Sequence, residues 1–169
     1  MLHSPLPTFP QTLEAWRALE AFVPEKVHFL GISNTTLPIL EELCNQANVK
    51  PSIVQNRFYP STRFDVPLRR FCRENHIVFQ SFWTLTANPG LLRSAPVTAL
   101  AEETGVSVQE SLYAFVLGLE GVTILNGTTN EGRMQGDLEG VKKVDEWREK
   151  NEGQWMIRMR EFKNIIGEP

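Results

Sequence analysis

Short apolar runs alternate with amphipathic segments along this chain. Four of the runs are typical of buried strands, at residues 27–32, 52–55, 77–82 and 122–125. Strands separated by helical segments at this spacing form βαβ units, which predicts an α/β fold with a parallel sheet. We expect residues 27–32 and 122–125 at the edges of that sheet, with residues 1–3 as the stub of a fifth strand beside the former.

Between and after the strands, apolar residues recur at the spacing of an α-helix. In the first such segment Leu13, Trp16 and Leu19 lie about one turn apart. The helix that begins at Asp65 is expected to be N-capped near that residue. Because no linker and no low-complexity stretch divides the chain, we expect a single domain over residues 1–169. The predicted helices cover residues 12–22, 37–47, 65–74, 96–103, 107–119, 131–148 and 154–165.

Composition and charge narrow the class of protein. Hydrophobic residues make up 41% and charged residues 22% of the 169 residues, which is typical of a globular chain that buries a core. The net charge of −3, without a basic stretch, argues against a nucleic-acid partner, and no apolar run approaches the roughly 18 residues of a membrane span. The N-terminus does not resemble a signal peptide, and Cys44 and Cys72 fit buried thiols in a reducing compartment. We therefore expect a cytoplasmic protein.

A series of short motifs goes further than the periodicity. The motifs are Leu2-His3-Ser4-Pro5, Gly31-Ile32-Ser33-Asn34, Val54-Gln55-Asn56, Gln80-Ser81-Phe82-Trp83, and Asn126-Gly127-Thr128-Thr129-Asn130 followed by Arg133 and Leu138. Taken in order along the chain, they resemble the C-terminal half of the (β/α)8 barrel of the aldo-keto reductase family. The resemblance implies a partial TIM-type (β/α) barrel with four main parallel strands, flanking helices and a stub of a fifth strand. A complete barrel of this type needs about 250 residues.

The same resemblance implies a site for a nicotinamide cofactor, NADP(H) or alternatively NAD(H). Ser33, Asn34 and Gln55 match the family's ligands of the nicotinamide carboxamide. Phe82 falls where the family stacks an aromatic ring on the cofactor. Each residue also has a plainer interpretation: Ser33 and Asn34 as helix caps, Gln55 as a buried amide that needs partners, and Phe82 as a core side chain. The other residues that the resemblance assigns to the cofactor site are Trp83, Leu85, Thr128, Asn130, Arg133 and Asp137.

Two departures from the family pattern concern the cofactor's phosphate end. Gly127-Thr128 stands where the family commonly has Lys-Ser, which puts a tight preference for a 2′-phosphate in doubt. Arg133 is the remaining candidate for that contact, and an exposed helix charge is its alternative. Asp137 falls where an Asn often touches the adenine.

Catalytic candidates are few. His3 matches a family histidine that hydrogen-bonds the substrate carbonyl, although a chain terminus can also fray. The family's proton-donating Tyr and its Lys and Asp partners come from earlier strands, and Tyr59 and Tyr113 do not match that motif. General acid catalysis is typically worth about 10²–10⁴-fold, so we expect a poor reductase. No residue spacing suggests a metal site.

Three functions stay open at this point. The first is a truncated NADP(H)-dependent carbonyl oxidoreductase that keeps its cofactor residues and acts on a small carbonyl substrate. The second is a non-redox isomerase, lyase or cyclase that uses no cofactor. The third is a catalytically inactive binding partner of a full-length relative. Because a half barrel leaves its strand edges and inner face open, we expect a homodimer or a complementing N-terminal half; alternatively, the helices close over the sheet.

Overall fold

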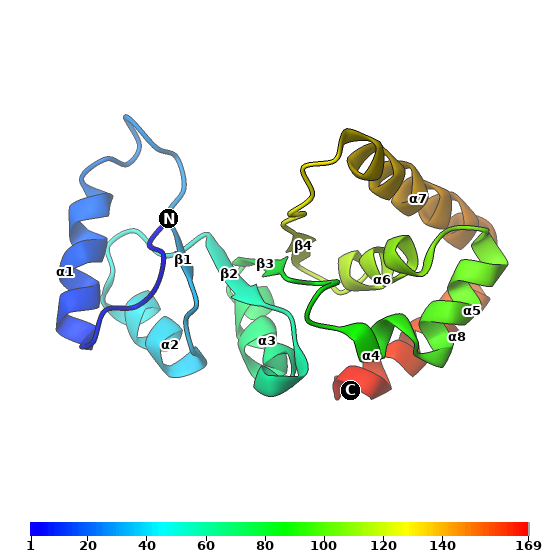
Figure 1. Cartoon of the computed structure of the whole chain (residues 1–169). Coiled ribbons are helices and arrows are strands. Elements are labelled where there is room, and N and C mark those ends of the chain that lie inside the picture. Colours follow the sequence, from blue (N-terminus) through cyan, green and yellow to red (C-terminus); the bar gives the residue numbers. More distant parts are fainter. Residues whose placement is uncertain (169) are drawn as a thin grey trace.

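The structure, a computed structural model, describes residues 1–168, so Pro169 at the end of the predicted domain lies outside the described residues. Four parallel strands form one sheet in the order β1-β2-β3-β4. They run across the middle of the molecule in Figure 1, with α1 and α2 at one end and α5 to α8 at the other. The prediction of four main parallel strands is confirmed. The strands are β1 (Gly31–Ser33), β2 (Ile53–Arg57), β3 (Val78–Phe82) and β4 (Val122–Ile124).

The helices largely follow the predicted segments. Thr8 caps the first helix and Pro10 stands in its first turn, so that helix begins one turn earlier than the periodicity suggested. The sequence did not indicate two short elements, the 3-10 helix η1 and α4. The helical elements are α1 (Phe9–Glu20), α2 (Leu37–Gln46), η1 (Pro60–Asp65), α3 (Val66–Glu74), α4 (Pro89–Leu92), α5 (Ala95–Thr104), α6 (Val108–Leu117), α7 (Glu131–Lys150) and α8 (Glu152–Ile166).

The predicted strand at residues 27–32 is mostly wrong. Only its last two residues pair with β2, through Gly31↔Ile53 and Ile32↔Val54. The Val27 amide donates instead to the Phe22 carbonyl in a turn, at 3.1 Å. The chain is therefore still turning where the predicted strand was expected to begin, and its pairing with β2 starts only at Gly31. The side chain of Phe29 is 70% exposed as a result.

A fifth strand stub lies beside β1, as predicted. Leu2 forms an isolated parallel bridge with Ile32. Its amide donates to the Gly31 carbonyl at 2.8 Å, and its carbonyl accepts from the Ser33 amide at 2.9 Å. The N-terminus is therefore held against the edge of the sheet.

The core lies between the sheet and the helices that cover its outer face. Ile32, Val54 and Phe79 stand opposite one another in register on β1, β2 and β3, and all three are buried. A second packing centre joins the C-terminal helices, where the ring of Phe115 stacks on those of Trp155 and Phe162 at centroid distances of 5.4 and 4.8 Å. Both belong to one continuous cluster of buried side chains.

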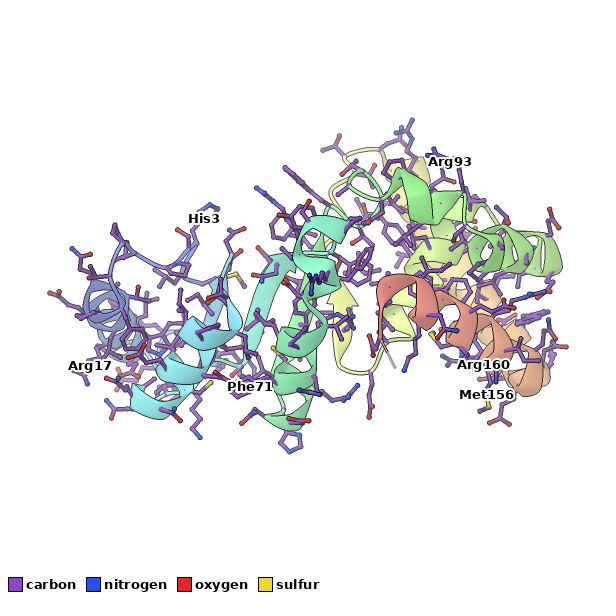
Figure 2. The ribbon with its side chains drawn as sticks, turned by 90° about the horizontal axis from the view of Figure 1, so that it is seen from below. His3, Arg17, Phe71, Arg93, Met156 and Arg160 are labelled. Carbon is purple, nitrogen blue, oxygen red and sulfur yellow. The ribbon has the colours of Figure 1, made fainter. Side chains whose placement is uncertain are left out.

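The C-terminal segment is tied back to α3 by a buried ion pair. Arg69 Nη1 lies 2.7 Å from Glu168 Oε2, and Arg73 and Lys163 lie within 4.0 Å of the other carboxylate oxygen. The Arg69 Nε also donates to the Phe64 carbonyl at 2.8 Å. In Figure 2, Arg17 of α1 and Arg160 of α8 lie near opposite ends of the molecule, with Phe71 of α3 between them.

Candidate functional site

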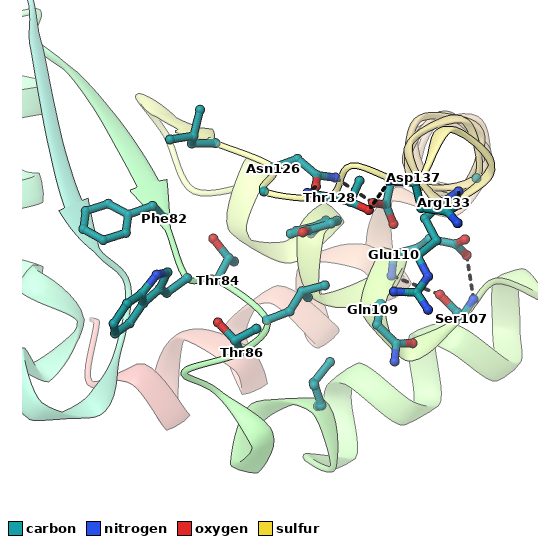
Figure 3. A pocket seen from close by; sticks show the side chains of 18 of the residues that line it. Phe82, Thr84, Thr86, Ser107, Gln109, Glu110, Asn126, Thr128, Arg133 and Asp137 are labelled. Carbon is teal, nitrogen blue, oxygen red and sulfur yellow. Dashed lines mark hydrogen bonds between the residues drawn. The ribbon is translucent and has the colours of Figure 1, made fainter.

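A cleft of about 1270 Å³ opens where the carboxyl ends of the strands meet α6 and α7. In parallel α/β folds this end of the strands is the usual place for a ligand site. Figure 3 shows Phe82 on one side of the cleft and Glu110, Arg133 and Asp137 on the other. Every site residue that the sequence predicted lines this one cleft: His3, Ser33, Asn34, Gln55, Phe82, Trp83, Leu85, Thr128, Asn130, Arg133 and Asp137.

The strand side of the cleft is built by hydrogen bonds between neighbouring strand ends. The Ser33 hydroxyl donates to the Gln55 carbonyl at 2.7 Å. The Asn34 amide nitrogen donates to the His3 carbonyl at 2.9 Å and to the Ser33 hydroxyl at 3.2 Å. The capping interpretation of Ser33 and Asn34 is wrong, because α2 begins at Leu37 with Thr36 as its N-cap residue. Both side chains are thereby left at the cleft.

Asn34 also holds the N-terminus in place. Its backbone has φ 52°, in the left-handed region that Asn tolerates better than most residues. This turn aims its side chain at the His3 carbonyl. The His3 side chain is exposed and lines the cleft, while its backbone is fixed on one side by Asn34 and on the other by the Leu2 bridge. His3 is therefore not part of a frayed terminus.

Gln55 has the partner that a half-buried amide needs. Its Nε2 donates to Oε1 of Gln80 on the neighbouring strand at 2.5 Å, and the two residues are paired in register. Gln80 was not among the predicted site residues. The signal was present, since two glutamines in otherwise apolar strands that pair in register must lie side by side on one face. The pair leaves Gln55 Oε1 available to a ligand's amide.

The aromatic side of the cleft combines two rings and a guanidinium. Phe82 and Trp83 meet edge to face with centroids 6.1 Å apart. The Arg57 guanidinium carbon lies 4.3 Å from the Trp83 ring centroid and 5.9 Å from that of Phe82. Trp83 has φ 55°, a conformation that a bulky residue adopts at a cost of about 1–3 kcal/mol and that often marks functional sites. Its side chain is 54% exposed, so it forms a wall open to ligand.

The loop after β4 is fixed by its own side chains. Asn126 Oδ1 accepts from the Thr128 amide at 2.9 Å, and Asn126 Nδ2 donates to Asp137 Oδ2 at 2.6 Å. Asn130 is the N-cap of α7, because its Oδ1 accepts from the Arg133 amide at 2.9 Å. Asn130 thus has a capping role in addition to lining the cleft. The N-terminus of α7 presents its dipole to this part of the cleft, an arrangement that favours an anion.

The sequence interpretation missed the wall that α6 contributes. Ser107, Gln109, Glu110 and Tyr113 all line the cleft. Ser107 and Glu110 form a capping box, in which the Ser107 amide donates to Glu110 Oε2 at 2.7 Å. The S-x-x-E pattern before an apolar segment was a readable signal for the start of this helix, but its contact with the cleft depends on tertiary packing.

Tyr113 is the tyrosine of this wall. Its side chain is buried, and that burial raises the pKa of its phenol above the usual value of 10.0, with the negative charge of Asp137 adding to the effect. Such a phenol stays protonated over the physiological range and is a weaker acid than a free tyrosine. It can donate a hydrogen bond, but it is not poised to give up its proton.

Among residues 1–168, no three His, Cys, Asp or Glu side chains gather closely enough to hold a metal ion. None of the helices in this range is both long and apolar enough to cross a membrane. Cys44 and Cys72 are buried in the core, where burial raises the pKa of the Cys72 thiol to about 12.

Comparison with known proteins places this geometry in context. The model of the Aldo/keto reductase family matches residues 1–149. An NAD/NADP-dependent indole-3-acetaldehyde reductase of Schizosaccharomyces pombe is 33% identical over 91 residues, covering 51% of this chain and 32% of its own length. A D-galacturonate reductase of Hypocrea jecorina is 28% identical over 156 residues, covering 85% of this chain and 50% of its own. The chain therefore spans half or less of the length of these relatives.

Solved structures agree on the fold. A variant protein determined in complex with NADPH superposes with a TM-score of 0.69 at 21% identity, covering 85% of this chain and 56% of its own. At this level of identity the match concerns the fold alone. The four-stranded sheet with its flanking helices is a partial barrel of this type.

Proposed function

The chain belongs to the aldo/keto reductase family, and on this premise we propose that it binds a nicotinamide dinucleotide, NAD(H) or NADP(H), in the cleft at its strand ends. The carbonyl group of a small substrate is then the expected reaction partner. One observation carries the proposal. Eleven residues chosen from the sequence, spread from His3 to Asp137, come together on the walls of a single cleft.

The residues present fit such a cofactor. Ligand pockets for drug-sized molecules measure about 300–1,000 Å³, so a cleft of about 1270 Å³ has room for a dinucleotide. Phe82 offers a ring face for a flat heterocycle, and Gln55 lies close by with an amide for a carboxamide. At the other end, Thr128 and the N-terminus of α7 supply hydroxyl and backbone donors for phosphate.

When bound, the nicotinamide would supply a hydride for the carbonyl carbon. The protein's part is to bind and orient the reactants, and to provide a proton for the developing alkoxide. His3 lines the cleft near the strand ends and can donate a hydrogen bond to a carbonyl oxygen. Tyr113 keeps its proton because burial raises its pKa. Without a better acid, general acid help of about 10²–10⁴-fold is missing, and we expect slow reduction.

Cofactor binding is tested directly by titrating the chain with NADH and NADPH and following tryptophan fluorescence. Phe82→Ala should weaken binding about tenfold, because it removes the stacking surface. Phe29→Ala is the matched control, since Phe29 is 70% exposed and does not line the cleft. If neither cofactor binds, or if both variants bind like the parent, the proposal is wrong. Substrate conversion without nicotinamide would favour the non-redox alternative.

We also propose that two copies associate through the open side of the sheet. On that side Val78 is 41% and Leu125 46% exposed, and β1 and β4 are the end strands of the sheet. A two-fold axis parallel to the strands would place β4 of one copy beside the Leu2 strand stub of the other. All strands of the two copies would then remain parallel. Sedimentation at micromolar concentration should show a dimer that Val78→Lys dissociates and Val27→Lys does not. A monomeric parent protein would contradict this assembly.

A further inference from the structure

The charged groups of the cleft gather at the end formed by α6 and α7. Besides His3 at the strand end, the charged side chains that line the cleft are Glu110, Arg133 and Asp137. Figure 3 shows these three on the side opposite Phe82. Two carboxylates against one guanidinium give this end of the cleft a net negative charge.

The Glu110 carboxylate is held in place from two sides. It accepts from the Ser107 amide at 2.7 Å in the capping box. It also packs against α7, where a Cβ built on Gly140 would lie only 2.5 Å from Glu110 Cδ. A glycine at this contact lets α7 pack closely against the Glu110 side chain. The charge of Glu110 is therefore a fixed feature of the cleft wall.

The Asp137 carboxylate is fixed as well. Its Oδ2 accepts from Asn126 Nδ2 at 2.6 Å, a contact that joins α7 to the loop after β4. The charge of Asp137 also reaches into the cleft, because it helps raise the pKa of the Tyr113 phenol. Two ordered carboxylates thus face the same space.

Arg133 is much less constrained. Within residues 1–168, its guanidinium makes no ion pair and no hydrogen bond. The backbone amide of Arg133, by contrast, donates to the Asn130 side chain. The residue is exposed. An exposed guanidinium on a flexible stem is screened by solvent, so it offsets the two carboxylates only in part.

We propose that Glu110 and Asp137 make this cleft prefer NAD(H) over NADP(H). The inference rests on the proposed function, because it needs a dinucleotide in the cleft with its adenosine half at the α6–α7 end. The 2′-phosphate of NADP(H) would bring about two negative charges toward two fixed carboxylates. The ribose of NAD(H) presents hydroxyl groups instead, and a carboxylate accepts hydrogen bonds from these.

The expected size of the preference follows from the charges. Like charges near a protein surface repel one another, and the repulsion falls with distance and with salt. Partial compensation by Arg133 and by the α7 dipole reduces it further. We expect NADH to bind about tenfold more tightly than NADPH at low ionic strength.

The test compares both dinucleotides on five proteins, the parent and four variants, by fluorescence titration or calorimetry. Glu110→Gln keeps the capping box, since Gln also accepts from the Ser107 amide, and Asp137→Asn keeps an acceptor for Asn126. The double variant should gain about tenfold in NADPH affinity with little change for NADH. Glu139→Gln, an exposed acid of α7 outside the cleft, is the matched control and should leave the preference unchanged.

Each outcome decides between the proposals. NADPH binding to the parent as tightly as NADH, or a double variant that keeps the NADH preference, overturns the role of the two carboxylates while the proposed function stands. Failure of the parent to bind either dinucleotide overturns the proposed function, and this inference with it. An equal shift in the Glu139→Gln control would show a long-range charge effect and would also overturn it.

Discussion

Two neighbouring rows of side chains run across the sheet, and one row is apolar whereas the other is polar. The rows are one residue apart along each strand, and because strand side chains alternate they face opposite sides. The outer row is apolar and buried under the helices, whereas the inner row is polar, and Ser33 and Gln55 of this row line the cleft. The outer row is Ile32, Val54, Phe79 and Val122, and the inner row is Ser33, Gln55, Gln80 and Thr123.

This difference separates the face of the sheet that stabilises the fold from the face that offers polar groups to the proposed ligand. The outer row belongs to the continuous core of the molecule. The inner row has little apolar surface to bury, and its polar groups bond to one another, as Ser33 does to the Gln55 carbonyl and Gln55 to Gln80. A row of this kind contributes little to folding but offers donors and acceptors to a ligand.

The largest expected effect uses two phenylalanines of one strand that face opposite sides. Phe79 is 1% exposed in the core, and Phe79→Ala should lower the free energy of unfolding by about 3–5 kcal/mol. Phe82 is half-buried at the cleft, and Phe82→Ala should cost about 1–2 kcal/mol. Urea unfolding followed by circular dichroism measures both. Equal losses would remove the contrast between the two faces.

A second comparison concerns the ion pairs on the outer side. Glu168→Gln breaks the buried contact with Arg69 and leaves an uncompensated guanidinium, so it should destabilise the protein by about 3 kcal/mol. Glu120→Gln is the control, because the Glu120 carboxylate is 80% exposed at 3.8 Å from Arg73 and should contribute less than about 1 kcal/mol. Chemical denaturation of both variants checks this. A Glu168→Gln protein as stable as the parent would mean that the C-terminal segment is not anchored by this pair.

The wall of the cleft has its own matched pair of glycines on α7. A Cβ at Gly140 would meet Glu110 atoms at 2.5 Å, so Gly140→Ala should cost about 1–3 kcal/mol. At Gly136 the nearest atom is Glu110 Oε1 at 3.7 Å, an ordinary contact, and Gly136→Ala should be neutral or stabilise by up to about 1 kcal/mol. Thermal unfolding separates the two. The reverse order of effects would show that α7 does not press on Glu110.

Sequence patterns anticipated the strand-end residues of the cleft better than its other walls. Ser33, Gln55 and Phe82 were placed correctly at the cleft because strand ends of parallel sheets meet at one edge. Gln80 was missed although a second glutamine in a neighbouring apolar strand was a readable signal, because its contact with Gln55 also depends on the register of the two strands. Glu110 and Tyr113 needed the packing of α6 against α7, where side chains far apart in the chain meet.

Local backbone geometry set another limit on prediction. Arg63, Phe64 and Asp65 all have positive φ, a run that no residue preference would suggest. Asp65 does occupy the N-cap position of α3, as expected, but its carboxylate makes no capping bond and instead accepts from Asn56 Nδ2 at 3.0 Å. At this position a hydrogen bond to a distant residue, Asn56, replaces the expected bond to the helix's own backbone.

The smallest expected effect is a titration at the polar end of the cleft. Burial raises the pKa of the Tyr113 phenol above 10.0, and the charge of Asp137 raises it further. The unfolded chain would release this proton first as pH rises, so the stability that the neutral phenol contributes is complete below about pH 10 and is lost as pH climbs through the folded-state pKa. Tyrosinate absorbance, taken as the difference between the parent and Tyr113→Phe, isolates this group. Asp137→Asn should move the Tyr113 midpoint downward, because it removes one of the two causes. An unchanged midpoint would mean that the Asp137 charge does not act inside the cleft, which would weaken the electrostatic contrast between its two ends.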